Sequence, residues 1–363
     1  MGRHGWTERG SEVAQATDGA PTQYVQTVEG PVPLDELGVT LMHEHLLCDN
    51  RAWWQPPAEA GDHELAHGPV TMDKLGRLRM DPFASLDNVR LTDVEAMARE
   101  AAAFAALGGR TLVEQTVHGI GRDVVGLRRI ARLTGLRIVS GTGYYLEPSH
   151  PPEVAAADPG WLEERMLRDL MQGDPEFGIR AGLVGEIGVG QDFTPQERKC
   201  LVAAARAHAR ARVPLSVHLP GWKRRGMEVL DVVEAAGGRL DRVILDHMNP
   251  SGEDLAYQEA LARRGAFLEY DMVGMDFYYR DQAAQSPCDE ANARAILRLA
   301  DRGFADQVLI SQDTFVKIQL KSYGGFGYDH ILRNFVPRLR RHGADEALLR
   351  RLLVDNPRRA FSW

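Results

Sequence analysis

Short apolar segments alternate with helix-forming segments along nearly the whole chain, and this alternation most limits the possible folds. Eight apolar or β-branched segments have the length and composition of buried strands. Strands separated by helices indicate a parallel sheet, and eight such units predict a closed (β/α)8 TIM barrel, an α/β fold. The predicted strands are Thr40–His43, Thr111–Thr116, Arg137–Gly141, Gly182–Ile187, Leu215–His218, Val243–His247, Phe267–Asp271 and Val308–Asp313.

The segments between these strands are rich in Ala, Arg, Leu and Glu, and several carry helix start and stop signals. Thr92 is an expected N-cap with Glu95 three residues later, and Gly108 follows that helix. Thr194 precedes Pro195, and proline is favoured at the first helical position. The predicted helices are Thr92–Leu107, Asp123–Thr134, Pro159–Met171, Arg198–Arg212, Gly226–Ala236, Gly252–Arg264, Asp289–Arg302, Tyr328–Arg341 and Ala344–Val354.

A doubly wound open sheet is the competing architecture. It would carry a glycine-rich dinucleotide-binding turn after its first strand, and Met42-His-Glu-His45 stands there instead. Residues 1–22 are rich in Gly, Thr and charged residues and predict a disordered tail. Tyr24–Gly30 and Val32–Gly38 predict a β-hairpin, and we expect residues 23–363 to form a single barrel domain.

Composition excludes several functional classes. The formal net charge is −8, and no basic run along the chain could follow a phosphate backbone, so we expect no nucleic-acid partner. No apolar run is long enough to span a bilayer, so we expect no membrane association. The three cysteines are too few and too scattered for a disulfide framework, which favours a reducing, cytoplasmic location.

Three connections are longer than the loops usual in such units, namely Asp49–Asn88, Met272–Pro287 and Thr314–Gly327. Each follows a predicted strand. In a barrel all three therefore extend from the C-terminal face, where barrel enzymes place their active sites. Mere surface insertions are the alternative interpretation.

Metal-binding side chains recur where the predicted strands end. Side chains alternate along a strand, so His43 and His45 point the same way and Glu44 points to the opposite face. Four other strand ends add Glu186, His218, His247 and Asp313. If the barrel closes, six groups able to bind metal converge on one face.

The ligand types narrow the choice of metal. Imidazole and carboxylate ligands without thiolate suit zinc, and also manganese, iron or cobalt. Six protein ligands exceed what one zinc ion with an open position needs, so two divalent ions about 3.5–4 Å apart fit the count better. We assign one ion to His43, His45 and Asp313, the second to His218 and His247, and the bridging position to Glu186.

This arrangement resembles the phosphotriesterase family of the amidohydrolase superfamily, from about Tyr24 to the C-terminus. The resemblance implies a binuclear metal barrel whose bridging hydroxide attacks a phosphoryl or carbonyl centre of a small molecule, and it implies a homodimer. The motifs that carry it are Met42-His-Glu-His45, Gly141-Thr-Gly-Tyr-Tyr145, Ala181-Gly-Leu-Val-Gly-Glu-Ile-Gly188, Ser216-Val-His218, Leu245-Asp-His247, Ile310-Ser-Gln-Asp313, Lys321-Ser-Tyr-Gly-Gly-Phe-Gly-Tyr-Asp-His-Ile-Leu332 and Asp355-Asn-Pro357.

Two features depart from the organophosphate hydrolases of this family. Those enzymes and related lactonases bridge their metals with a carboxylated lysine on the fourth strand. This chain has five lysines, none on that strand, and Glu186 stands there, as in the glutamate-bridged phosphotriesterase-related or homology proteins. The organophosphate hydrolases also carry a histidine just after the aspartate of the seventh strand. Here Met272 follows Asp271, which disfavours hydrolysis of neutral organophosphate triesters.

Several single residues have predicted roles. Asp313 is the expected catalytic residue, because a carboxylate ligand can also accept a proton from the hydroxide and pass it to the leaving group. Tyr144, Arg122 and Arg280 are candidate substrate-binding residues, with packing or surface ion pairs as the alternatives. One of Tyr144 and Tyr145 is expected to face the pocket while the other packs.

The leading functional prediction is a metal-dependent hydrolase acting on an ester-like bond, either a lactone or a phosphoester. An amidohydrolase acting on an N-acyl amine or amino acid is the alternative within the same chemistry. A non-catalytic metal-binding barrel is the alternative of a different class. The same hydroxide can attack all of these substrates, so the metal ligands cannot distinguish among them, and the long loops must do so.

Overall fold

Eight parallel strands form the centre of the molecule, as predicted. The computed structural model describes residues 23–57 and 60–363. The strands follow one another around the sheet in the order β14-β11-β10-β9-β8-β7-β6-β3. The Asp313 backbone N–H donates to the carbonyl of His43 at 3.1 Å, which links the two outer strands and closes the barrel. The strands are β3 (Val39–Glu44), β6 (Gly109–Glu114), β7 (Arg137–Thr142), β8 (Leu183–Gly188), β9 (Leu215–His218), β10 (Val243–Leu245), β11 (Phe267–Tyr270) and β14 (Val308–Ile310).

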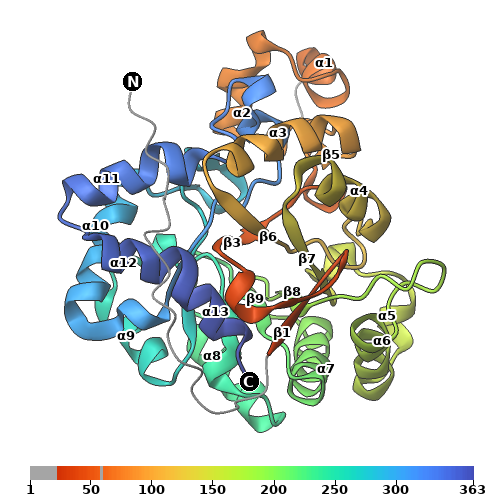
Figure 1. The fold of residues 1–363 in the computed structure, drawn as a ribbon. Helices are drawn as coiled ribbons and strands as arrows, with labels where there is room; N and C mark the ends of the chain where they lie inside the picture. Colours follow the sequence, from red (N-terminus) through yellow and green to blue (C-terminus); the bar gives the residue numbers. More distant parts are fainter. Residues whose placement is uncertain (1–22, 58–59) are drawn as a thin grey trace.

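Helices surround this barrel, as Figure 1 shows, and most lie where the sequence predicts them. Pro159–Met171 matches its predicted bounds, and the Thr194 side chain caps α7 in a reciprocal pair with Glu197. The main helices are α3 (Val94–Ala106), α4 (Val124–Thr134), α6 (Pro159–Met171), α7 (Pro195–Ala211), α8 (Gly226–Ala235), α9 (Leu255–Arg263), α10 (Asp289–Leu299), α11 (Val336–Arg341), α12 (Glu346–Arg350) and α13 (Asn356–Phe361).

Some predicted helix ends were wrong. Asp93, and not Thr92, caps α3, because the Asp93 carboxylate accepts from the backbone N–H of Ala96. Helix α9 begins at Leu255 because a 3-10 turn over Asn249–Ser251 precedes it and Asp254 provides its cap.

The N-terminal face of the barrel is apolar. The predicted hairpin forms from β1 (Tyr24–Thr27) and β2 (Gly30–Pro33), and it lies with α13 against this end of the barrel. Buried side chains from seven of the eight barrel strands, together with Leu37 and with hairpin and α13 residues, fill the interior there. Each such side chain stabilises the fold by about 1.5–3 kcal/mol relative to exposure. We call this set of buried residues the apolar plug. It consists of Val25, Leu37, Met42, Val113, Val139, Leu183, Ile244, Phe267, Leu309, Ala360 and Phe361.

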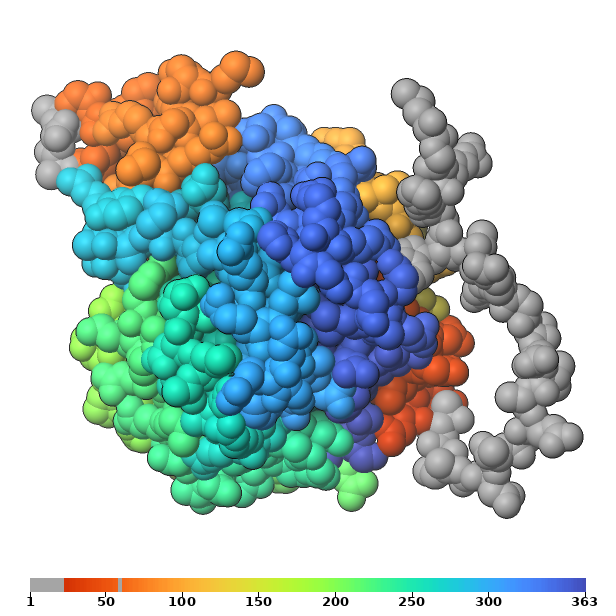
Figure 2. Space-filling view, turned by 90° about the vertical axis from the view of Figure 1, so that its left-hand side faces the viewer, coloured from red at the N-terminus to blue at the C-terminus, as the bar shows by residue number. Residues whose placement is uncertain are grey.

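The long connections lie on the opposite face, as predicted, and Figure 2 shows Asp49–Asn88 (orange) far from the hairpin (red). This connection contains α1 (His63–His67) and α2 (Leu75–Met80), which its sequence pattern did not predict. The connection after β11 forms a small antiparallel pair, β12 (Tyr278–Tyr279) with β13 (Ala284–Gln285). Within the described residues, no helix combines the length and apolar character needed to cross a membrane.

Candidate metal centre

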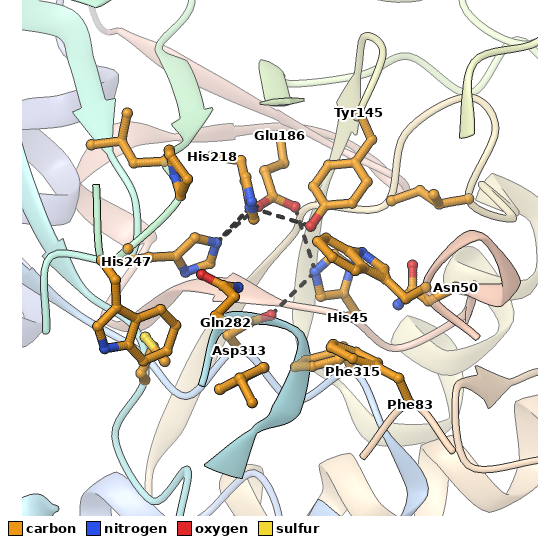
Figure 3. A pocket seen from close by; sticks show the side chains of 18 residues that line it. His45, Asn50, Phe83, Tyr145, Glu186, His218, His247, Gln282, Asp313 and Phe315 are labelled. Atoms are coloured by element: carbon orange, nitrogen blue, oxygen red, sulfur yellow. Dashed lines mark hydrogen bonds and ion pairs between the residues drawn. The ribbon is translucent and has the colours of Figure 1, made fainter. Parts of the chain in front are cut away.

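The six predicted metal ligands meet at the C-terminal end of the barrel. Figure 3 shows five of them at the floor of a cavity, with His45, Glu186 and Asp313 joined by close contacts. The Nε2 atom of His45 lies 3.3 Å from Asp313 Oδ1 and 3.8 Å from Glu186 Oε2. The Oε1 atom of Glu186 lies 2.8 Å from His218 Nδ1 and 3.2 Å from His247 Nε2. Glu186 therefore faces both histidine groups, as its predicted bridging position requires.

Irregularities in two strands bring these side chains inward. The register between β3 and β6 shifts between Leu41 and Glu44, so Met42 packs in the apolar plug while His43 reaches the site. The register between β8 and β9 shifts between Val184 and Ile187, and Glu186 turns inward between two outward-packed apolar residues. An extra residue in a strand reverses the alternation of side chains beyond it, which simple strand periodicity cannot predict.

Glycines allow the backbone to approach closely at this point. A Cβ on Gly185 would lie 2.6 Å from the Ser216 carbonyl oxygen, and the φ of Gly185 is +134°. A Cβ on Gly188 would lie 2.2 Å from the carbonyl carbon of Tyr145. Both positions therefore require glycine, and the second one brings Tyr145 close to β8.

His43 provides the strongest structural indication of a cation. It is fully buried, and neither of its ring nitrogens has a hydrogen-bond partner among the described residues. Its Nε2 lies 3.7 Å from both Glu186 Oε1 and Asp313 Oδ1. Leaving a buried polar atom unpaired is costly, and these atoms are too far apart for direct hydrogen bonds. The donor set of imidazole and carboxylate fits a divalent metal at this position.

Neighbouring carboxylates orient the histidine rings. The Thr116 hydroxyl donates to Glu114 at 2.6 Å, so its oxygen accepts from His45 Nδ1 at 2.9 Å. Likewise, His247 Nδ1 lies 3.0 Å from Asp271 Oδ1, where it donates. In both rings Nδ1 thus holds a proton toward its partner, and Nε2 on the cluster side is the nitrogen that would bind a metal.

Backbone strain marks two of the six residues. His247 and Asp313 adopt positive φ angles of 57° and 46°, which side chains other than glycine rarely do. These angles are incompatible with a strand, so β10 and β14 end earlier than predicted. Buried Glu44 accepts the backbone N–H groups of Gln312 and Thr314 at 3.0 and 3.1 Å and thereby fixes the segment around Asp313. Glu44 is thus paired behind the site, on the face opposite His43 and His45 where strand alternation places it.

Burial disfavours the charged form of every ionisable side chain in the cluster. Whether a given pKa is raised or lowered therefore depends on the neighbouring charges and hydrogen bonds. Burial lowers the pKa of His43 below its ordinary value. Burial also opposes the charge of Asp313, but the hydrogen bond from His45 and the charge of His43 outweigh it and lower the pKa of Asp313. Burial alone would lower the pKa of His45, yet the hydrogen bond with Asp313 and its charge raise this pKa to about 9. A cation binding here would displace a proton from His45.

The predicted substrate-binding residues do not line the cavity. Tyr144 is buried beside the rings of His118 and His150, and it is Tyr145 that lines the cavity, with its hydroxyl 3.2 Å from His218 Nδ1. The Arg122 guanidinium donates from Nε to the Gly141 carbonyl at 2.7 Å.

Arg280 is likewise turned away. Its side chain is 71% exposed and lies 3.7 Å from Asp81. Tyr144, Arg122 and Arg280 all lie near strand ends, but this position did not predict the direction of their side chains. Each lies in an irregular connection whose course the sequence does not specify.

The cavity and its open mouth together hold about 610 Å³ of empty space. Six aromatic residues line it, and sequence analysis predicted only one of them, from the Tyr144–Tyr145 pair. Asn50 and Gln282 are its neutral polar residues, and Met272 lines it next to Asp271. Aromatic pairs in the long loops were the available signal, but the sequence could not show which member faces inward. The aromatic residues are Trp53, Phe83, Tyr145, Trp222, Tyr279 and Phe315.

The closed parallel barrel and the histidine–carboxylate cluster at its C-terminal end define the class of barrel hydrolases with a buried metal-binding site. A sequence profile of the phosphotriesterase family matches residues 23–361. The chain belongs to the phosphotriesterase family.

Similar proteins agree with this assignment. An N-acetyltaurine hydrolase from Tetraodon nigroviridis is 33% identical over 92% of this chain and 96% of its own length. The crystal structure of a resiniferatoxin-binding protein from Rhodobacter sphaeroides is 50% identical, with a TM-score of 0.92, over 93% of this chain and 95% of that one. The crystal structure of a lactonase from Listeria monocytogenes is 26% identical, with a TM-score of 0.77, over 94% of this chain and 99% of that one.

Proposed function

We propose that this chain is a binuclear metal-dependent hydrolase that cleaves an ester-like carboxylic acyl bond, as in a lactone or a carboxylic ester. The observation that carries this proposal is buried His43, whose two unpaired ring nitrogens lie within a cluster of histidines and carboxylates at the cavity floor. The proposed ligands remain those assigned from the sequence, with Glu186 between the two ions. Zinc is the expected metal, and manganese, iron and cobalt fit the same donors.

The protein side chains would divide the reaction among them. When bound, two divalent ions would lower the pKa of a water molecule and polarise the substrate carbonyl. Asp313 holds an ionised carboxylate at the cavity floor and accepts the proton of the attacking water, then transfers it to the leaving oxygen. The backbone contacts that Glu44 makes around Asp313 keep this carboxylate in place.

Phosphotriesters fit this site less well than carboxylic esters. The organophosphate hydrolases that this chain resembles carry a histidine where Met272 lines the cavity here. A thioether cannot accept and release a proton as an imidazole can. We therefore rank phosphotriesters below carboxylic substrates.

Amide hydrolysis is the second candidate, and the relatives named N-acetyltaurine hydrolase favour it. Taurine carries a sulfonate, and an anion of this kind needs a cationic partner when it leaves water. Among the described residues that line the cavity there is no Lys or Arg. This lining favours the ester over the N-acyltaurine.

A substrate panel with metal-loaded enzyme tests these alternatives. We expect the highest kcat/KM for an uncharged lactone or carboxylic ester, lower values for N-acetyltaurine, and the lowest for an aryl phosphotriester. Enzyme stripped with chelator and then reloaded is the control. Turnover that survives full metal removal would contradict the proposal, and a clear preference for N-acetyltaurine would replace the ester with the amide.

A further inference from the structure

The walls of the cavity are formed by aromatic rings from five different strand-to-helix connections. Trp53 and Phe83 follow β3, and the other four rings follow β7, β9, β11 and β14, one from each. Figure 3 shows Tyr145, Phe83 and Phe315 around the floor formed by His45, Glu186 and Asp313. Rings from five separate loops can meet in one wall only because the barrel brings those loops together.

These rings touch one another to form a continuous surface. Trp53 stacks on Phe83 with centroids 5.1 Å apart and planes 14° from parallel. Phe83 then approaches Tyr279 at 5.8 Å and Phe315 at 6.3 Å. Tyr279 in turn lies 5.3 Å from Trp222. Such contacts add about 0.5–1.5 kcal/mol per pair beyond area burial, so the wall is a preformed surface.

Where two aromatic residues are consecutive in the chain, only one of the two side chains faces the cavity. In Trp53-Trp54, Trp53 lines the cavity while Trp54 packs on the ring of His67 at 5.2 Å. In Tyr278-Tyr279, only Tyr279 lines the cavity. Tyr145 and its outward-packed neighbour Tyr144 repeat this arrangement. Three loops thus each direct one ring of a pair toward the same space.

The wall carries no charge that would hold an anion. Among the described residues that line the cavity, the ionisable ones are Tyr145, Tyr279 and the proposed metal ligands on the floor. Tyrosine hydroxyls are uncharged near neutral pH, so Tyr145 and Tyr279 add no charge to the wall. Aromatic faces carry a partial negative charge, which repels anions and accepts apolar groups or other rings. Asn50 and Gln282 supply only neutral hydrogen-bonding groups.

We infer that the aromatic wall is a binding site for an aryl ring of an uncharged substrate, so that the substrate class is an aryl-substituted carboxylic ester or lactone. This inference rests on the proposed function. The ring packs against the Trp53–Phe83 stack, and the ester carbonyl lies toward the floor.

Three methyl esters with the same reacting group test the inference with metal-loaded enzyme. They are methyl acetate, methyl phenylacetate and methyl 4-sulfophenylacetate. We expect kcat/KM for methyl phenylacetate to exceed that for methyl acetate by at least ~100-fold, since one well-placed methylene alone gives ~10–200-fold. We expect the sulfonated ester to lose at least ~30-fold relative to methyl phenylacetate, because its anion would be buried without a partner. Equal values for the sulfonated and unsulfonated esters would overturn the inference.

Substitutions in the aromatic wall test whether the preference for methyl phenylacetate depends on these rings. Phe83→Ala should reduce the preference for methyl phenylacetate over methyl acetate by about tenfold, because the ring loses its packing partner. Trp53→Ala, at a part-exposed position, should do the same if Phe83→Ala does not fold. Phe326→Ala is the matched control, because Phe326 is 52% exposed and lies outside this cavity. An unchanged preference in both wall variants would refute the inference, as would an equal loss in Phe326→Ala.

Equilibrium binding separates this inference from the proposed function. Phenylacetone is an uncharged, non-hydrolysable counterpart of methyl phenylacetate, and calorimetry measures its binding to the metal-loaded protein. If no ester is hydrolysed, the proposed function fails. Phenylacetone binding that is weakened about tenfold by Phe83→Ala or Trp53→Ala would still support the aryl site. Absence of phenylacetone binding, or equal binding of its 4-sulfonated form, would overturn the aryl site.

Discussion

The two ends of the barrel are built from the same eight strands, but they differ in chemistry. At the N-terminal end, the apolar plug fills the interior with side chains that are almost all fully buried. At the C-terminal end, buried histidines and carboxylates replace them, and His43 and Glu269 have side-chain atoms without hydrogen-bond partners among the described residues. The first end stabilises the fold through burial of apolar area. The second end carries unpaired buried polar groups that destabilise the free protein and suit a bound cation.

The backbone shows the same difference. His247 and Asp313 have left-handed backbone conformations at the C-terminal end, and the register shifts in β3 and β8 lie beyond Leu41 and Val184. Strain and irregular strands of this kind are concentrated at functional sites. The comparison therefore predicts that substitutions at one end change stability, while substitutions at the other change activity and metal binding.

The largest effect should come from Asp313→Asn. This change preserves the shape of the side chain but removes its negative charge and its capacity to accept a proton. With metals restored, kcat should fall by ~10²–10⁴-fold, as expected when a general base is lost. Steady-state kinetics measures this, with Asp306→Asn near the N-terminal end as the matched control, because Asp306 is about half exposed and pairs with Arg351. Near-normal turnover in metal-replete Asp313→Asn would end its proposed catalytic role.

Phe267→Ala tests the opposite end. Phe267 is buried in the apolar plug, and its truncation leaves a cavity that the closed barrel cannot easily fill. The free energy of unfolding should fall by about 3–5 kcal/mol. Chemical denaturation measures this loss, and kcat per folded molecule is the companion measurement. A large fall in kcat with unchanged stability would show that the two ends are not separate in function.

Glu186→Gln tests the proposed bridge between the ions. An amide is a poorer ligand than a carboxylate and leaves the two cations less neutralised. Affinity for both ions together should fall by about 100-fold, the upper end of the range seen when a group that supports a metal ligand is lost. Elemental analysis after dialysis against a weak chelator measures this, and we expect two ions per chain in the unmodified protein. Loss of only one ion would contradict the bridging assignment.

A smaller effect should appear at His208, which is buried in the last turn of α7 beside Trp363. Burial lowers the pKa of His208 to about 4, against its ordinary value of 6.5. Between these values the unfolded chain binds a proton that the folded protein does not, so stability decreases as pH falls from 6.5 toward 4. The loss due to His208 should be about 2 kcal/mol at pH 5.

The His208→Gln variant isolates this contribution. The amide can replace both hydrogen bonds of the ring, which His208 makes to the Val213 carbonyl and the Arg239 backbone N–H. Denaturation at several pH values should then show a shallower decrease in stability below pH 6.5 than in the unmodified protein. Identical pH profiles would show that His208 titrates normally in the folded state.

The sequence alone determined the barrel and the position of its chemistry along the chain. The alternation of apolar and helical segments is a local pattern, because each strand and helix buries one face that its own residues specify. Parallel strands of a barrel place all their C-terminal ends on one face. The positions of Glu186, His218 and Asp313 at strand ends were therefore sufficient to predict that they meet.

Only the tertiary structure decided which side chains face the cavity. Strand-end position predicted that His43 and Glu186 reach the site, but the extra residues in β3 and β8 that turn them inward are not visible in any local pattern. The loops decide the rest, because their course depends on contacts with residues far away in the chain. Tyr145 lines the cavity while Tyr144 packs behind it, and Arg280 lies in solvent beside Asp81. The directions of these side chains depend on contacts with residues distant in the chain, which the local sequence does not specify.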